Sequence, residues 1–150
     1  SESISSVIKT PYDALILASI VEREAVLDAE KPIIAGVFVN RLLKNMRLQS
    51  DPTVIYGLGE SFDGNLTKRH LKHKTPYNTY RIDGLPPTPI CMPSEKSILA
   101  AVNPEHSEAL YFVAKGDGTH KFSNNLEDHQ IAVKEYQIFN RKKEYKTSPN

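Results

Sequence analysis

The chain has 150 residues, of which 39% are hydrophobic and 25% charged, so it is long enough to bury a core, and its composition is that of a globular domain and not of a disordered chain. Nineteen basic and eighteen acidic residues give a net charge of +1, which favours neither nucleic acid nor a membrane surface as a partner. The single cysteine, Cys91, excludes an intrachain disulfide, and without an apolar run of about 18 residues we expect a soluble chain with no membrane segment.

The N-terminal part predicts two helices after a leader at residues 1–10. The first helix covers residues 11–27, because a proline is tolerated in a first turn and an aliphatic pattern follows it. The second covers residues 28–44, with Asp28 as the N-cap and Pro32 in the first turn. Its apolar residues form a broad stripe, which predicts a face packed against the core.

Residues 45–93 are rich in turn signals, among them Asp51-Pro52 and Gly57-Leu58-Gly59. Only two short helices are expected there, at residues 53–56 and 67–72. A loop region of this length in a compact domain commonly builds a binding site, so we expect it to form the cleft.

The C-terminal part predicts a helix, a hairpin and a last helix. The helix begins at Ser94 and ends near Asn103-Pro104. Residues 109–115 and 119–123 are expected to be strands, joined by the turn Gly116-Asp117-Gly118. The last helix covers residues 126–143 and presents the apolar side chains Ile131, Val133, Tyr136, Ile138 and Phe139.

These elements together predict an α+β fold, mainly helical, with a small antiparallel hairpin and a long loop-rich segment. We expect one domain over residues 1–150. Residues 141–150 contain four positive side chains and one acid, which predicts a basic, flexible tail.

Two carboxylates at the end of the first helix are the candidate catalytic groups. On a helix with 3.6 residues per turn, Glu24 lies over Ile20 and Val21. A carboxylic acid held against aliphatic side chains has a raised pKa and can donate a proton near neutral pH. Glu22 points to another face of the helix, so spacing favours Glu24 without deciding between them. Alternatively, both glutamates only solvate a helix end beside Arg23.

The loop region carries side chains of the kind that bind carbohydrate. Amides, hydroxyls and carboxylates hydrogen-bond sugar hydroxyls, and tyrosine rings stack on the apolar faces of sugar rings. Each residue could instead stabilise its own loop through turn hydrogen bonds. The candidates are Arg47, Gln49, Ser50, Asp51, Tyr56, Tyr77, Asn78, Thr79 and Tyr80.

The histidines give weaker signals. His70 and His73 have the spacing of half a metal site, but they lie in a basic stretch without nearby carboxylates, so we expect a solvated turn and no metal. His120 and His129 flank the second strand and the start of the last helix, where structural hydrogen bonds are the simplest role.

Six segments in this order and spacing resemble the YceG-like family, the endolytic murein transglycosylases. The resemblance extends from about residue 15 to residue 130, which is most of the chain. The segments are Leu17-Ala18-Ser19-Ile20-Val21-Glu22-Arg23-Glu24, Ile34-Ala35-Gly36-Val37-Phe38-Val39-Asn40-Arg41-Leu42, Met46-Arg47-Leu48-Gln49-Ser50-Asp51-Pro52-Thr53-Val54, Tyr77-Asn78-Thr79-Tyr80, Gly84-Leu85-Pro86-Pro87 and His120-Lys121-Phe122.

The resemblance implies cleavage of the β-1,4 bond between N-acetylmuramic acid and N-acetylglucosamine without water, which leaves a 1,6-anhydromuramyl end. It implies that Glu24 is the single acid and base, that Glu22 has a supporting role, and that no cofactor takes part. With it, we assign substrate binding to Gln49, Ser50, Asp51, Tyr77, Asn78, Thr79, Tyr80 and His120.

The resemblance also implies a longer parent protein at the bacterial inner membrane, with this domain facing the periplasm. Its N-terminal membrane anchor and a LysM-like module would lie outside this chain. Peptidoglycan glycan strands, and through the parent protein the cell-wall synthesis proteins, are the expected partners.

Two other functions are consistent with the same residues. A hydrolytic muramidase would need a second carboxylate, for which the position of Asp51 is best suited. A non-catalytic glycan-binding module would bind peptidoglycan and release no fragments.

Overall fold

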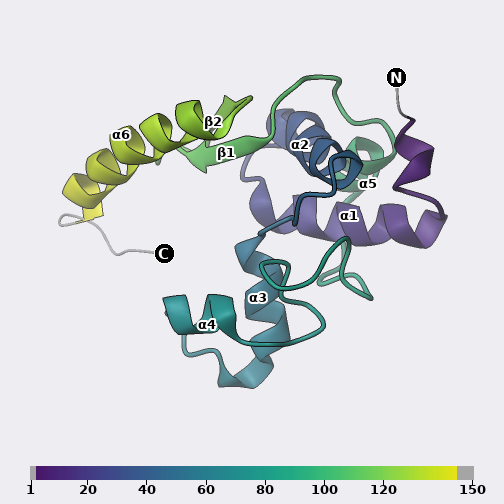
Figure 1. Cartoon of the computed structure of the whole chain (residues 1–150), viewed down its shortest axis with the longest axis horizontal. Coiled ribbons are helices and arrows are strands. Elements are labelled where there is room, and N and C mark those ends of the chain that lie inside the picture. Colours follow the sequence, from purple (N-terminus) through teal and green to yellow (C-terminus); the bar gives the residue numbers. More distant parts are fainter. Residues whose placement is uncertain (1–2, 145–150) are drawn as a thin grey trace.

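Three helices pack together to form the core of the molecule. This computed structural model describes residues 3–144, with side chains through residue 137. After a short 3-10 turn at Ile4–Ser6, helix α1 (Pro11–Glu24) lies against both α2 (Lys31–Leu43) and α5 (Glu95–Val102) (Figure 1). The buried side chains between them include Leu17, Ile20, Val21, Ile34, Ala35, Phe38, Ala100 and Ala101.

Helix α1 begins and ends at residues that the sequence explains. Thr10 caps its first turn, since its hydroxyl accepts from the Asp13 N–H and the Asp13 carboxylate accepts from the Thr10 N–H. The helix ends at Glu24, three residues before the predicted end, because Ala25 is extended and Val26, 72% exposed, has left the core. Glu24 is therefore the last residue of α1.

The predicted helix at residues 28–44 is divided. A 3-10 turn, Asp28–Glu30, precedes α2, and Asp28 is the first residue of that turn and does not cap α2. Pro32 lies in the first turn of α2 as expected. Gly36 lies on α2 where the backbone carbonyl of Glu105 approaches, so there is no room for a Cβ atom.

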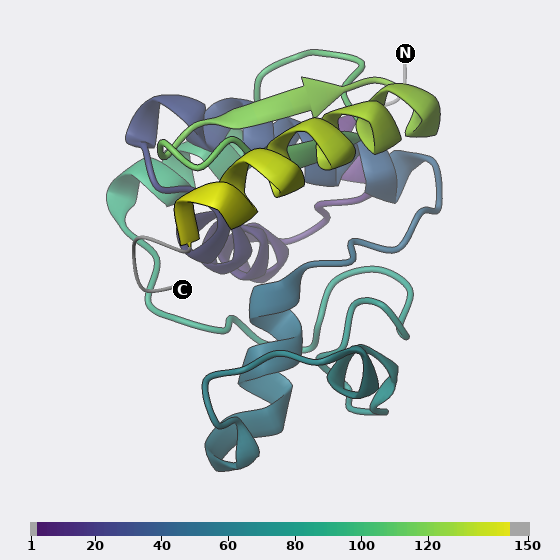
Figure 2. The ribbon, with the colours of Figure 1, turned by 90° about the vertical axis from the view of Figure 1, so that its left-hand side faces the viewer.

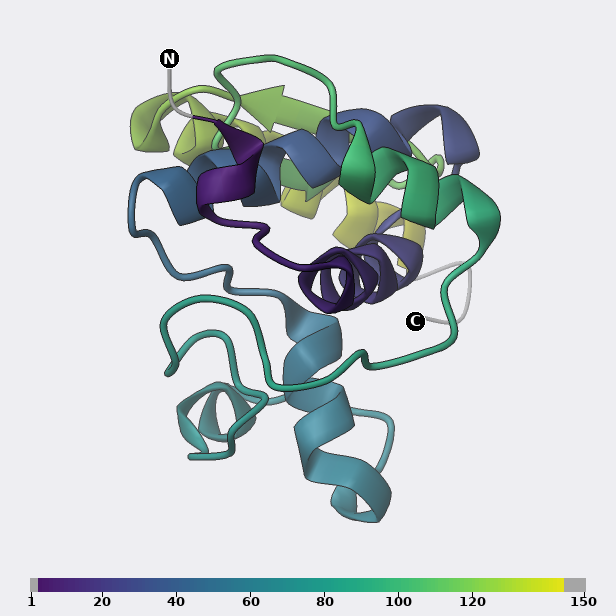
Figure 3. The same cartoon turned by 90° about the vertical axis from the view of Figure 1, so that its right-hand side faces the viewer.

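Two helices and the irregular segment after them project from the core, and we call this part of the molecule the lower lobe. It contains most of the predicted loop region. Helix α3 (Asp51–Leu58) continues into a 3-10 turn at Gly59–Ser61, and the short helix α4 (Lys68–Lys72) packs against it. Helix α3 extends beyond the predicted residues 53–56 at both ends, and α4 is one residue shorter than the helix predicted at residues 67–72. Figure 3 shows α3 descending below α1, with the irregular segment after α4 beside it.

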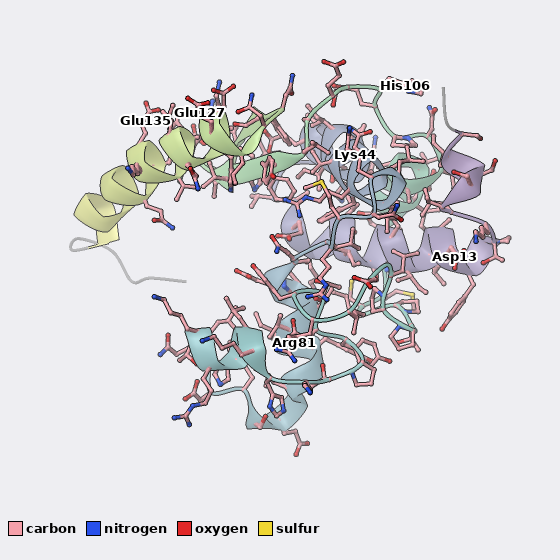
Figure 4. The ribbon with its side chains drawn as sticks, viewed as in Figure 1. Asp13, Lys44, Arg81, His106, Glu127 and Glu135 are labelled. Carbon is pink, nitrogen blue, oxygen red and sulfur yellow. The ribbon has the colours of Figure 1, made fainter. Side chains whose placement is uncertain are left out.

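A β-hairpin packs against α2. Strands β1 (Tyr111–Ala114) and β2 (His120–Ser123) pair antiparallel, with Phe112 opposite Phe122. The Phe112 ring meets that of Phe38 on α2 edge-on, with 5.8 Å between centroids. Helix α6 (Leu126–Glu144) packs against both strands (Figure 2), and its exposed Glu127 and Glu135 point away from α3 and α4 (Figure 4).

The α+β, mainly helical prediction is confirmed, with the hairpin as its sheet. Both strands are shorter than predicted, and α6 continues into the predicted tail. The side chains of Ile138 and Phe139, the leader residues 1–2 and the tail residues 145–150 lie outside the described part of the chain. Among the helices that the structure describes, none is both long enough and apolar enough to cross a membrane.

Candidate active site

A cleft of about 530 Å³ opens where the end of α1, the middle of α2, the segment before α3 and the hairpin meet. These elements are distant in sequence, so the cleft exists only in the folded domain. Its lining mixes carboxylates, tyrosines and a guanidinium with aliphatic side chains. The lining residues are Glu24, Val37, Phe38, Arg41, Leu48, Gln49, Asp51, Tyr80, Leu110, Tyr111, Phe112, Val113, Ala114, His120, Leu126 and His129.

Glu24 lines this cleft from the C-terminal end of α1. Burial raises the pKa of Glu24 from 4.5 to about 7; a hydrogen bond from Ser50 opposes this rise and the charge of Asp51 adds to it. Ile20 and Val21, the neighbours expected from helical spacing, are fully buried beneath it. The predicted raised pKa of Glu24 is confirmed, and its carboxyl group holds a proton over part of the neutral range.

The surroundings of Glu22 lower its pKa, which is opposite to the effect at Glu24. Its Oε1 accepts hydrogen bonds from the Ser94 N–H at 2.9 Å and the Ser97 hydroxyl at 2.7 Å, and it lies 3.5 Å from the ammonium of Lys31. These bonds at the start of α5, together with Lys31, lower the pKa of Glu22 to about 2. Glu22 is therefore ionised at neutral pH and attaches α1 to α5, so it has no proton to donate.

Asp51 and Tyr80 form a pair on the wall of the cleft. The Tyr80 hydroxyl donates to Oδ1 of Asp51 at 2.6 Å, and Asp51 is the first residue of α3, where the helix dipole favours a negative charge. Burial and this hydrogen bond raise the pKa of Tyr80, so the phenol stays protonated and keeps donating. The pair provides one exposed carboxylate that is close enough to influence the titration of Glu24.

Gln49 lines the same wall, and its backbone has a conformation that few residues other than glycine adopt. Its φ is +51°, in the left-handed region, and its N–H donates to the Thr79 carbonyl at 3.2 Å. Non-glycine residues in this region cost free energy, and they are concentrated at functional sites. The backbone bend at Gln49 allows the next residue, Ser50, to face Glu24.

Of the eight residues assigned to substrate binding, four do not line the cleft, namely Ser50, Tyr77, Asn78 and Thr79. Ser50 and Thr79 are fully buried and Asn78 is 1% exposed. The Asn78 amide donates to the carbonyls of Leu71 and His73, closing the loop after α4. These groups are used inside the protein, as the alternative of loop stabilisation expected.

Tyr77 is likewise part of the lower lobe. Its ring packs on that of Tyr56, with 4.8 Å between centroids, and its hydroxyl shares a 2.7 Å hydrogen bond with Thr88. Gly57 faces this contact, and a Cβ atom there would meet the Thr75 hydroxyl. Tyr77 thus holds α3 against the loop that follows α4.

His120 lies in the cleft and is attached to the segment between α1 and α2. Its Nδ1 and its backbone N–H contact the two carboxylate oxygens of Glu30, at 2.8 and 3.0 Å. The ring also meets Phe112 edge-on. His120 therefore combines a position on the cleft wall with a structural hydrogen-bonded contact to Glu30.

The cleft contains a group that sequence reasoning did not single out. Arg41 on α2 is 7% exposed, and it donates to the carbonyls of Leu110 and Arg47, each at 2.7 Å. Its guanidinium lies 4.8 Å from the Tyr111 ring centre, and His129 stacks on the same ring. An arginine within an apolar helical stripe was the available signal, because a buried guanidinium requires partners.

The pair His70 and His73 has a local role. The backbone N–H of Thr67 donates to Nδ1 of His70, which completes a capping box at the start of α4. Over the described part of the chain, no group of three or more His, Cys, Asp and Glu side chains is arranged to hold a metal ion.

A cleft in which one carboxylic acid keeps its proton near neutral pH, beside a second carboxyl group, is a site capable of general acid catalysis. Residues 2–135 match the YceG-like family, and the chain belongs to that family. The resemblance inferred from the six sequence segments is thus confirmed.

Individual relatives agree with this membership. A protein named endolytic murein transglycosylase from Bacillus subtilis (strain 168) is 43% identical over 125 residues, 83% of this chain and 34% of that protein. One of the same name from Streptococcus pneumoniae serotype 2 (strain D39 / NCTC 7466) is 36% identical over 132 residues, 85% of this chain and 24% of that protein. The chain therefore spans about a third or less of the length of these curated relatives.

A solved structure shares the fold as well as the sequence. The crystal structure of a yceG-like protein from Listeria monocytogenes superposes with a TM-score of 0.76 at 45% sequence identity. The match covers 81% of this chain and 39% of that one.

Proposed function

We propose that this domain is the catalytic domain of an endolytic murein transglycosylase, which cleaves the β-1,4 bond between N-acetylmuramic acid and N-acetylglucosamine inside a glycan strand. The observation that carries the proposal is the position of Glu24, a carboxylic acid with a pKa of about 7 on the wall of a polar cleft. Relatives that are 43% and 36% identical over more than four fifths of this chain bear the name of that activity.

In the first step Glu24 acts as an acid. Its proton passes to the glycosidic oxygen as the bond from that oxygen to C1 of the muramyl residue breaks. The positive charge that develops at C1 is stabilised by the carbonyl oxygen of the sugar's own N-acetyl group, so no nucleophilic carboxylate is needed. N-acetylglucosamine leaves with a free hydroxyl.

In the second step Glu24, now ionised, acts as a base. It takes the proton of the muramyl C6 hydroxyl, whose oxygen attacks C1 and closes the 1,6-anhydro ring. The carboxyl group ends the cycle protonated, and no water is consumed. A pKa near 7 suits both steps, because the group gives up and regains its proton at similar cost.

For substrate contacts we propose those earlier candidates that line the cleft, namely Gln49, Asp51, Tyr80 and His120. Arg41, Tyr111 and His129 complete the wall. We propose that Tyr77, Asn78 and Thr79 support the cleft from within the lower lobe, since their polar groups are bonded inside the protein.

A hydrolytic muramidase is the second candidate, because Asp51 places another carboxylate in the same cleft as Glu24. That carboxylate could activate a water molecule. The products decide between the two: an anhydromuramyl end is one water lighter than a reducing end. A glycan-binding module would release neither.

The test is mass spectrometry of fragments released from purified peptidoglycan. The wild-type chain is expected to release anhydromuropeptides, and Glu24→Gln is expected to bind the glycan without releasing fragments. The matched control is Glu60→Gln, an exposed glutamate on the lower lobe, which is expected to retain activity. Reducing ends from the wild type would contradict the transglycosylase mechanism, and full activity of Glu24→Gln would contradict the role of Glu24.

For the parent protein we propose a place at the bacterial inner membrane, with this domain facing the periplasm and acting on nascent strands near the cell-wall synthesis proteins. Its support is the murein substrate named for the relatives. Fractionation of cells with an antibody against this domain tests it, and recovery in the cytoplasmic fraction would contradict it.

A further inference from the structure

Ser50 makes the only hydrogen bond to the Glu24 side chain among the described residues. Its hydroxyl donates to Oε2 of Glu24 at 3.0 Å. Ser50 is fully buried, so a sugar in the cleft cannot reach its hydroxyl. Whatever Ser50 contributes to the reaction must therefore pass through Glu24.

A buried network of hydroxyl groups fixes Ser50 in place. The Ser50 N–H donates to the Thr79 hydroxyl at 2.8 Å, and the Thr53 hydroxyl donates to the Ser50 carbonyl at 2.7 Å. The hydroxyls of Thr53 and Thr79 are 2.8 Å apart, and both residues are fully buried. Ser50 is thus held on both sides of its backbone, which leaves its hydroxyl one well-defined direction.

The direction of that bond matters for a group that acts first as an acid and then as a base. A hydroxyl that donates to a carboxylate stabilises the ionised form, whereas burial destabilises it. Ser50 therefore works against the effect of burial on Glu24. Without it, the carboxyl group would hold its proton more tightly and would occupy more than one rotamer.

We propose that Ser50 is a positioning residue, which fixes the carboxyl group of Glu24 towards the cleft and stabilises the ionised state in which Glu24 acts as the base. This rests on the proposed function for its effect on activity, but its effect on the titration of Glu24 does not. Thr53 and Thr79 contribute to the site by holding Ser50 in this position.

The test is Ser50→Ala, with Ser61→Ala as the matched control, since Ser61 is an exposed serine bonded only to the Leu58 carbonyl. In Ser50→Ala the Glu24 carboxyl, followed by carbon-13 NMR, is expected to titrate about one pH unit higher, since a hydrogen bond to a charged group has about that effect. The alkaline limb of kcat/KM is expected to move with it, and kcat to fall about 10-fold with KM little changed. Ser61→Ala is expected to leave both measurements at wild-type values.

A titration of Glu24 that is the same in folded Ser50→Ala and wild type overturns the proposal. If Ser50→Ala does not fold, Ser50→Cys keeps the shape with a weaker donor, and its Glu24 is expected to titrate higher by a smaller amount. An unshifted titration in Ser50→Cys overturns the proposal equally. If the wild type releases no anhydromuropeptides, the proposed function fails while the titration still tests Ser50.

Discussion

Glu24→Gln is expected to make the protein more stable at alkaline pH while removing activity. The pKa of Glu24 is 4.5 in the unfolded chain and about 7 in the folded protein, so between these values the folded state binds the additional proton. Stability of the wild type therefore falls as pH rises from 4.5 to 7. At about 1.4 kcal/mol per pH unit, the loss approaches about 3 kcal/mol above pH 7.

Glutamine keeps the shape of glutamate and carries no charge, so the variant avoids this loss. Below pH 4.5 glutamate is protonated in both states and the two proteins should have the same stability. The assay is thermal unfolding at pH 4 and pH 8. For a domain of this size, about 3 kcal/mol corresponds to a rise in Tm of roughly 6–12 °C at pH 8.

The control for this prediction is Glu60→Gln, which removes a charge from an exposed position and should change Tm little at either pH. The reasoning is refuted if Glu24→Gln changes Tm by the same amount at pH 4 and pH 8. It is also refuted if the variant is less stable than the wild type at pH 8. Both results would mean that the folded protein does not oppose ionisation of Glu24.

Three further variants test other contacts. Glu22→Gln should destabilise the protein by about 1–2 kcal/mol at pH 7 in urea unfolding, and because the pKa of Glu22 is about 2, the difference should disappear as pH falls from 4.5 to 2. Asp51→Asn should lower the pKa of Glu24, moving the alkaline limb of the pH–rate profile down, and should still give anhydro products; loss of all products would favour the hydrolytic alternative. Gly36→Ala should lower stability by about 1–3 kcal/mol in the same unfolding assay, since its Cβ would collide with the Glu105 carbonyl; unchanged stability would show that the backbone moves apart freely.

The sequence predicted the parts of the site that depend on local structure. Helical spacing put Glu24 over Ile20 and Val21, which are fully buried, and it is the burial of Glu24 itself that raises its pKa. Ser94 was predicted to begin a helix, and it caps α5. These features depend on residues within one turn of each other, where a helix leaves little choice.

The remaining parts depend on contacts between distant segments. Nothing local distinguishes Glu22, whose partners at the start of α5 lie more than seventy residues away. Asn78 and Thr79 look like sugar-binding groups in a loop. Only the folded structure shows that Asn78 is already bonded to the carbonyls of Leu71 and His73, and Thr79 to Ser50 and Thr53. Polar residues in long loops serve both purposes, and their composition does not separate them.

The cleft exists only after α1, the segment before α3 and the hairpin have packed together. Glu24 therefore acquires its raised pKa late in folding. In a growing polypeptide leaving the ribosome, position 24 is synthesised long before Ser50 and β1, and it is then an ordinary ionised carboxylate with no proton to give at neutral pH. An incomplete or unfolded chain therefore has no proton donor at position 24 and cannot catalyse the reaction. For a protein proposed to cut the polymer that encloses the cell, this ties the capacity for damage to the integrity of the whole fold.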